Sequence, residues 1–109
     1  RFVEDEEIVD LYSGARCAVL PSLHEGFGMP VLEALAFGTR VVASDLGSIR
    51  EAGGDLVAYC DPLSVASIAA ALKQTVETEP PEDFISRAKR HVENNSWQQT
   101  AQIIKELIL

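Results

Sequence analysis

Residues 17–44 read CAVLPSLHEGFGMPVLEALAFGTRVVAS, and this stretch decides the fold. It opens with a short apolar run, 17–21, of the kind found in strands buried on both faces, and a second such run follows at 40–44. Between the runs, Pro30 suits the first position of a helix, strong helix formers follow, and Gly38 suits the stop. Two strands joined through a helix predict a parallel pair with a right-handed crossover.

The same alternation continues in both directions along the chain. Residues 1–3 have the pattern of a strand end, and acids at the start with Gly14 near the end predict a helix over 4–15. Downstream, the patterns predict a short helix within 45–54 and a strand over 56–60. A helix over 65–77 follows, capped by Asp61 or Ser64. After Pro80-Pro81 we expect a helix over 82–93 and a last helix from Ser96, with Trp97 as its anchor. The fold class expected is therefore α/β, a partial Rossmann-like parallel sheet of three to four strands with flanking helices.

Two surface expectations follow from the same patterns. The apolar face of the helix over 65–77 is expected at Val65, Ile68, Ala69, Leu72 and Val76. The short basic cluster Lys89, Arg90 and His91 is expected to be a solvated helix face, with attachment to a membrane surface as the alternative.

Composition narrows the function classes. The chain has 109 residues, 47% of them hydrophobic and 24% charged, as expected of one globular domain. Its net charge of −8, without a basic stripe, argues against binding nucleic acid. No apolar run approaches the roughly 20 residues of a membrane span, and the opening RFVEDEE is unlike a signal peptide, so a cytoplasmic protein is expected.

The cysteines and histidines show no metal-ligand spacing. Cys17 and Cys60 lie far apart in β-like runs and are expected to be small buried hydrophobic residues. His24 and His91 are isolated from each other and from the cysteines. We therefore predict no metal site and no cofactor.

The loop at 22–29 is the predicted binding site. In open parallel sheets, ligands bind beyond the carboxyl ends of the strands, where a loop leads into the next helix. Gly26 and Gly28 remove side chains from the approach, and a helix that begins near Pro30 offers unpaired N–H groups to a phosphate. Pro30 itself has no N–H, so the expected donors are those of Met29, Val31 and Leu32.

Two carboxylates in this region need a partner other than phosphate, which they would repel. Glu25 lies in the loop and Glu33 about one turn into the helix, so the two can reach opposite ends of an elongated ligand. Carboxylates accept hydrogen bonds from paired hydroxyls, and a ligand with hydroxyls at both ends and phosphate between them is a nucleotide sugar. The alternative from the residues alone is that both acids are solvated and that the GFG sequence is only a tight turn.

The stretch EGFGMPVLEALAFGTRVVASD, residues 25–45, resembles the E-x7-E segment of retaining group 1 glycosyltransferases, family 4-like enzymes of the two-domain GT-B fold. The segments at 2–22, 48–62 and 95–101 also resemble that family, so the resemblance covers nearly the whole chain. Arg40 stands where the family often has proline, a departure that we regard as neutral.

The resemblance implies a role for each residue of the loop and helix. Glu25 matches the catalytic glutamate that contacts hydroxyls of the transferred sugar, and Glu33 matches the one that holds the ribose. Phe27 and Gly28 match positions whose backbone amides approach the donor sugar. Met29, Val31 and Leu32 match the helix start beneath the diphosphate.

The implied reaction is metal-independent transfer of a hexosyl group, mannosyl or glucosyl, from a GDP- or UDP-hexose to a glycan or lipid acceptor. Residues 1–109 would form the carboxyl-terminal portion of the nucleotide-sugar-binding domain of a longer chain. A basic Arg/Lys pair and an amino-terminal acceptor domain would lie upstream. Alone, the chain is expected to be inactive, to bind donor weakly and to self-associate through uncovered strands.

Two alternatives remain open at this point. One is a glucan synthase of the glycogen or starch type, which uses a similar glutamate pair. The other is a non-catalytic α/β interaction module that folds alone. For the parent enzyme, peripheral association with a membrane is the alternative to a purely cytoplasmic state.

Overall fold

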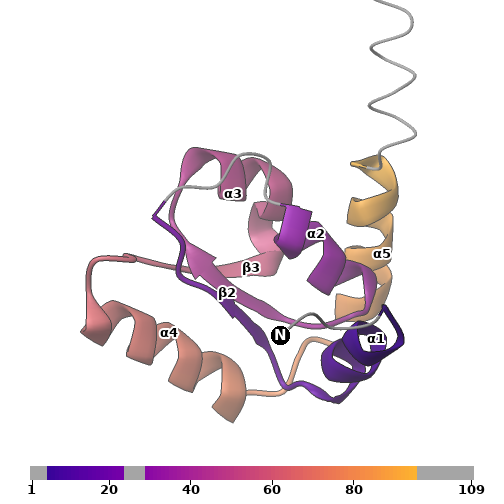
Figure 1. Ribbon diagram of the computed structural model, residues 1–109, viewed down its shortest axis with the longest axis horizontal. Coiled ribbons are helices and arrows are strands. Elements are labelled where there is room, and N and C mark those ends of the chain that lie inside the picture. Colours follow the sequence, from indigo (N-terminus) through magenta and orange to yellow (C-terminus); the bar gives the residue numbers. More distant parts are fainter. Residues whose placement is uncertain (1–4, 24–28, 96–109) are drawn as a thin grey trace, which may run out of the picture.

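The computed structural model describes residues 5–23 and 29–95 of the chain, shown in Figure 1. Its elements, in chain order, are α1 (Asp5–Gly14), β1 (Ala18–Leu20), α2 (Met29–Ala36), β2 (Val41–Ser44), α3 (Gly47–Gly53), the 3-10 turn η1 (Gly54–Leu56), β3 (Val57–Cys60), α4 (Val65–Glu77) and α5 (Phe84–Asn94). The predicted alternation of strands and helices is confirmed. The strand end expected at 1–3 and the helix expected from Ser96, with Trp97, lie outside the described residues.

The described strands form one parallel sheet in the order β1-β2-β3. Val42, in the central strand, pairs with Val19 on one side and with Ala58 on the other. All four residues of β2 are buried, as its continuous apolar run predicts. The expectation of a strand buried on both faces is wrong for β1, where Val19 is 39% exposed. Within residues 5–23 and 29–95, β1 has a neighbouring strand on one side only, so β2 alone is flanked by strands on both sides.

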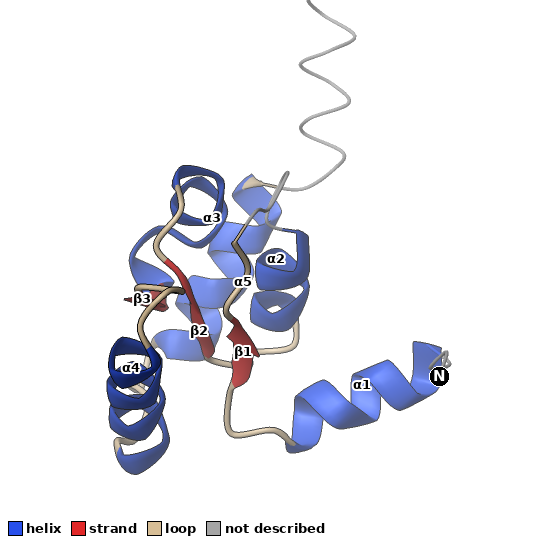
Figure 2. Ribbon diagram, turned by 60° about the vertical axis from the view of Figure 1, so that its left-hand side comes forward, coloured by secondary structure: helices blue, strands red, loops and turns tan. Residues whose placement is uncertain are grey.

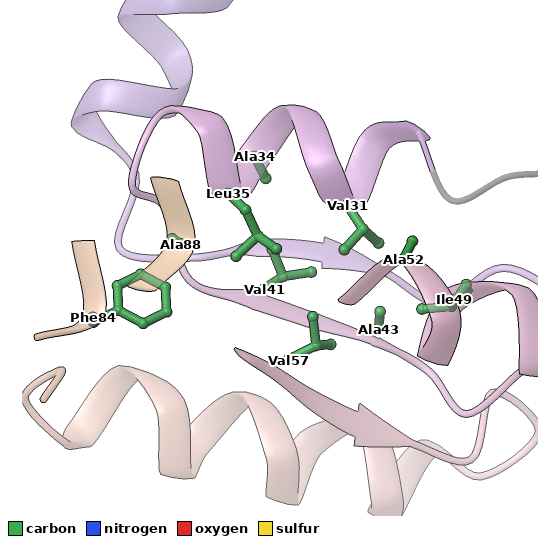
Figure 3. Packing of buried hydrophobic residues seen from close by; sticks show 10 residues of the cluster. All are labelled: Val31, Ala34, Leu35, Val41, Ala43, Ile49, Ala52, Val57, Phe84 and Ala88. Atoms are coloured by element: carbon green, nitrogen blue, oxygen red, sulfur yellow. The ribbon is translucent and has the colours of Figure 1, made fainter. Parts of the chain in front are cut away.

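Helices cover the two faces of the sheet unequally. Figure 2 shows α2, α3 and α5 on one side and α4 on the other. The main core lies on the three-helix side, where side chains of α2, α3 and α5 meet Val41, Ala43 and Val57 of the sheet (Figure 3). Because successive side chains of a strand point to opposite faces, the fully buried Val42 belongs to the α4 side.

Glycines and one serine fix the helix ends. Gly38, with φ 71°, follows α2, and Gly54, with φ 57°, ends α3, so both adopt a backbone conformation that favours glycine. Ser64 caps α4 by accepting a hydrogen bond from the N–H of Ser67 at 3.1 Å. Asp61, the alternative cap, instead accepts the N–H of Leu63 in the preceding turn at 2.9 Å.

The apolar face of α4 was only partly predicted. Ile68, Leu72 and Val76 are half-buried, whereas Val65 is 84% exposed and Ala69 is exposed. Thr75 is buried in their place, and its hydroxyl donates to the carbonyl oxygen of Ala71 at 2.9 Å. Because this bond satisfies the hydroxyl, a polar side chain can be buried against the sheet. A search for hydrophobic periodicity does not detect such a residue.

The basic cluster on α5 is likewise only partly a solvated face. Lys89 and Arg90 are exposed, but His91 is half-buried, and its Nε2 lies 2.5 Å from the carbonyl oxygen of Ala52. The neighbouring Arg87 forms an ion pair with Asp55 of η1 at 2.8 Å. These two contacts attach α5 to the α3–η1 segment, so His91 is a packing residue.

Both cysteines are free thiols. Cys60 is buried, as expected, and its thiol lies 3.4 Å from the carbonyl oxygen of Ala43. Cys17 is half-buried. No helix in the described part of the chain has both the length and the hydrophobicity that crossing a bilayer requires.

Candidate functional site

The carboxyl ends of the three parallel strands lie at one edge of the sheet, and the candidate site is built there. Leu20 ends β1, Ser44 ends β2 and Cys60 ends β3. The connection from β1 to α2 contains Glu25, Phe27 and Gly28, which lie outside the described residues together with His24. The predicted roles of these residues therefore stay predictions.

The start of α2 lies at this edge, beside α3 (Figure 1). Met29 is the first helical residue and Pro30 the second, as the sequence predicted to within one residue. An α-helix leaves the N–H groups of its first turn without intrahelical partners, and its N-terminus carries partial positive charge. The N–H groups of Met29 and Val31 are in this first turn, whereas Leu32 lies where the intrahelical ladder begins.

The side chains at the start of α2 serve the core. Val31 is 1% exposed and belongs to the main hydrophobic cluster, and Leu32 packs against that cluster. Any contact from these two residues to a phosphate would therefore come from the backbone. Packing of this kind holds the helix start rigidly at the edge of the sheet, as an anion site requires.

Glu33 is exposed on α2, about one turn from the helix start. It lines a hollow of about 390 Å³ together with Leu11, Tyr12, Ala15, Cys17 and Ala18. Tyr12 is held there because its ring stacks on Phe37 at 5.3 Å between centroids. Burial raises the pKa of the Tyr12 phenol, and the charge of Glu33 in the same hollow adds to this rise. The structure thus brings the exposed Glu33 to an apolar hollow formed by the end of α1 and the start of β1, toward the amino ends of the strands and not at the edge where α2 begins.

A polar cluster at the same edge was missed by the sequence reasoning. Asp45, directly after β2, accepts hydrogen bonds from Nε and Nη2 of Arg50, the latter at 3.1 Å. The guanidinium of Arg50 lies over the ring of Tyr59, 4.3 Å from its centroid, and the Tyr59 hydroxyl donates to the carbonyl oxygen of Gly54 at 2.6 Å. An acid directly after a buried strand was the available signal.

The hydrogen bond from Arg50 holds the pKa of the Asp45 carboxyl below its usual range. The cluster therefore keeps an anion and a cation paired beside the strand ends at neutral pH. Within residues 5–23 and 29–95, no group of three His, Cys, Asp or Glu side chains is arranged to hold a metal ion.

Comparison with known proteins assigns the chain to a family. The model for "Glycosyl transferases group 1" matches residues 1–91, which include the predicted loop and the whole of α2. The chain belongs to the group 1 glycosyltransferases. The resemblance seen in the sequence is thereby confirmed, and the α/β fold with its parallel sheet is the one expected of a Rossmann-like domain in this family.

Several curated proteins resemble the chain. The O-antigen chain mannosyltransferase B of Escherichia coli is 36% identical over 98 residues, covering 89% of this chain and 26% of that protein. The MMP alpha-(1->4)-mannosyltransferase of Mycolicibacterium hassiacum is 34% identical, covering 91% of this chain and 25% of that protein. A glycogen synthase of Mycobacterium tuberculosis is 34% identical over 100% of this chain and 28% of that protein. The chain thus spans about a quarter of the length of these relatives.

Proposed function

We propose that this chain is the carboxyl-terminal portion of the nucleotide-sugar-binding domain of a retaining glycosyltransferase of the GT-B type. The observation that carries the proposal is the placement of α2 in a chain of this family. The helix starts at the carboxyl edge of a parallel sheet and carries Glu33 about one turn from its N-terminus. A phosphate at the helix start and a ribose at Glu33 fit one extended ligand.

The proposed roles follow the order of the residues along that ligand. Glu25 acts on the transferred sugar as the catalytic residue, and the backbone of Phe27 and Gly28 contacts the same sugar. The first turn of α2 binds the diphosphate through the backbone N–H groups of Met29 and Val31, since the N–H of Leu32 lies where the intrahelical ladder begins. Glu33 holds the ribose. No metal ion takes part in this scheme.

The donor proposed is a GDP- or UDP-hexose, and the group transferred is mannosyl or glucosyl. Two of the relatives described above are named mannosyltransferases, which favours mannosyl transfer to a glycan or lipid acceptor. The match of a glycogen synthase to the whole of this chain supports the second candidate, a glucan synthase. Both candidates use the same edge of the sheet, so the donor distinguishes them.

The test is a transfer assay with the full-length parent protein, GDP-mannose and UDP-glucose. We expect one of the two donors to be consumed and the product to keep the anomeric configuration of the donor, as read by proton NMR. Transfer with inversion of the anomeric configuration would contradict the proposal. So would the absence of any transfer from a panel of nucleotide hexoses.

Two variants of the parent separate the proposed roles. Glu33→Ala should weaken nucleotide binding roughly ten- to a hundredfold, because a lost charge-assisted hydrogen bond costs about 1.5 to 3 kcal/mol. Glu25→Ala should chiefly lower turnover. Glu51→Ala is the matched control, since Glu51 is an exposed glutamate of α3 outside the proposed donor site. Equal nucleotide affinity in Glu33→Ala and Glu51→Ala would exclude the ribose role.

The chain alone is proposed to bind donor weakly and to transfer nothing. A helix N-terminus contributes about 0.3 to 2 kcal/mol toward a phosphate, whereas association costs at least about 4 kcal/mol. Affinity should then be no better than about millimolar. NMR titration of the 109-residue chain with UDP- and GDP-sugars checks this, and micromolar saturation would contradict it.

A cytoplasmic location is part of the same proposal. Its support is that both cysteines are free, as is usual in a reducing compartment. Cell fractionation of the parent would test it, with recovery in a salt-extractable membrane fraction supporting peripheral association instead.

A further inference from the structure

Two arginines converge on a hollow at the amino edge of the sheet, opposite the edge at which α2 begins. Arg16 lies two residues before β1 and Arg40 directly before β2. Both line a hollow of about 290 Å³, and Thr78, Glu79, Phe84 and Ile85 line it from the segment that joins α4 to α5. This placement concentrates positive charge in a chain whose net charge is −8.

The end of α4 orients both guanidinium groups. Nη1 of Arg16 donates to the carbonyl oxygen of Val76 at 3.1 Å, and Nη1 of Arg40 lies 3.5 Å from Oγ1 of Thr78. The Thr78 hydroxyl in turn donates to the carbonyl oxygen of Gln74 at 2.7 Å, so its oxygen is free to accept from Arg40. The partial negative charge of a helix C-terminus favours cations, which explains why two like charges gather here.

These bonds leave most of the donor capacity of the two arginines unused. Each guanidinium carries several N–H donors in a planar fork, and each donates one of them to the end of α4. In the part of the chain that the structure describes, neither guanidinium forms an ion pair with a carboxylate. A tetrahedral oxyanion between them would accept from both forks and relieve their mutual repulsion.

The rest of the lining indicates which oxyanion fits. Phe84 is 5% exposed and Ile85 is 56% exposed, so the hollow has an apolar wall beside its two cations. Gly38, with φ 71°, lies beside Ile85, where an added Cβ would come 3.5 Å from Cγ1 of that side chain. We propose that Arg16 and Arg40 bind a phosphate group here, either inorganic phosphate or the phosphate of a small phosphomonoester whose organic part rests on Phe84 and Ile85.

The proposal is independent of glycosyl transfer. Of the residues assigned to the donor, those that the structure describes, from Met29 to Glu33, do not line this hollow. Glu79, which also lines the hollow, is the internal anion that a bound phosphate must displace or avoid.

The test is NMR titration of the isotope-labelled 109-residue chain with inorganic phosphate, at an ionic strength held constant with sodium chloride. We expect saturable shifts in the backbone amides of Thr39, Thr78 and Glu79. Shifts confined to Met29–Leu32, or the same shifts with chloride alone, would overturn the proposal. The first pattern would show phosphate at the start of α2 and the second a general salt effect.

Variants make the assignment specific. Arg16→Gln and Arg40→Gln should each weaken phosphate binding roughly fivefold or more, because each removes a charge-assisted donor. Lys89→Gln is the matched control, since Lys89 is an exposed cation of α5 outside the hollow. The spectrum of each variant reports whether it is folded. Arginine variants that are folded and bind phosphate as tightly as Lys89→Gln would refute the site.

Two further measurements complete the design. Glu79→Gln should bind phosphate more tightly, and weaker binding would contradict the arrangement.

Phenyl phosphate distinguishes the sources of the phosphate group. Tighter binding than inorganic phosphate, with shifts extending to Phe84 and Ile85, supports a phosphomonoester, whereas equal affinity supports the free ion.

Discussion

His91 of α5 and Ala52 of α3 are joined by a hydrogen bond, with 2.5 Å between the imidazole Nε2 and the carbonyl oxygen. Since a carbonyl oxygen can only accept, the imidazole donates this bond through Nε2–H. The ring also lies against Gly54, where an added Cβ would come 3.4 Å from Cε1. His91 therefore attaches α5 to the end of α3 by both packing and polar contact.

We expect His91→Ala to lower the free energy of unfolding by about 1 to 3 kcal/mol, because it removes the donor and leaves the Ala52 carbonyl without its partner. Lys89→Ala, on the exposed face of the same helix, should change it by no more than about 0.5 kcal/mol. Urea unfolding followed by circular dichroism measures both. Equal stability of the two variants would show that the His91 contact contributes nothing.

Two glycines of α3 should respond oppositely to the same substitution. A Cβ added at Gly53 would clash with Cγ2 of Val57 and come within 3.1 Å of the Tyr59 hydroxyl, whereas one added at Gly47 meets nothing within 4 Å. Val57 is a stiff, buried β-branched residue and cannot move aside cheaply. Gly53→Ala should therefore lose about 1 to 3 kcal/mol of unfolding free energy.

Gly47→Ala should instead gain up to about 1 kcal/mol, because alanine restricts the unfolded chain more than glycine does. Thermal unfolding of both variants, followed by circular dichroism, makes the comparison. A Gly53→Ala variant as stable as Gly47→Ala would mean that α3 can shift away from β3 without loss.

The pair Asp45–Arg50 predicts a dependence of stability on pH. The hydrogen bond from Arg50 lowers the pKa of Asp45 in the folded chain. The stabilisation is therefore complete above the ordinary carboxyl pKa of about 4 and is lost as the pH falls through the lower, folded pKa. Asp45→Asn should be less stable than the unchanged chain at pH 7, and the difference should shrink toward pH 3.

Urea unfolding of both proteins at several pH values between 7 and 3 measures this difference. Asp10→Asn, at an exposed position of α1, serves as the control for general charge effects. If the difference in unfolding free energy between Asp45→Asn and the unchanged chain stays constant from pH 7 to pH 3, the contribution of Asp45 does not depend on its charge, and the prediction is wrong.

Much of the fold could be predicted because local signals agree with the tertiary structure. Pro30 and Gly38 bound α2, the glycines at 53 and 54 end α3, and Ser64 caps α4. Such residues act through backbone geometry, which is local. Burial depends on neighbours distant in sequence, so the exposure of Val19 and the packing of His91 were not predictable.

The candidate site was likewise predictable from the sequence only in part. The start of α2 follows from helix signals in the sequence, and the structure places it as expected after β1. Glu33 lies one turn along that helix, beside the start of β1, and its role toward a ribose stays a prediction. The contact of Arg50 with Tyr59 joins α3 to β3, and no local pattern specifies it. Arg16 and Arg40 are far apart in sequence, and only the parallel pairing of β1 and β2 brings their neighbouring strand starts together.

The last prediction concerns the edge of the sheet at β1. Among residues 5–23 and 29–95, β1 pairs only with β2, so its other edge has no strand partner within these residues, and Val19 on one face of β1 is 39% exposed. Such an edge promotes association between chains. We expect the isolated 109-residue chain to self-associate as its concentration rises, as measured by light scattering.

Val19→Lys should shift this equilibrium toward monomer, because a charge on an edge strand opposes pairing. Leu63→Lys is the control, since Leu63 is 82% exposed away from β1, in the turn before α4. If both variants dissociate the assembly equally, the contact depends on exposed apolar surface in general. A wild-type chain that stays monomeric at high concentration would show that the open edge of β1 does not pair.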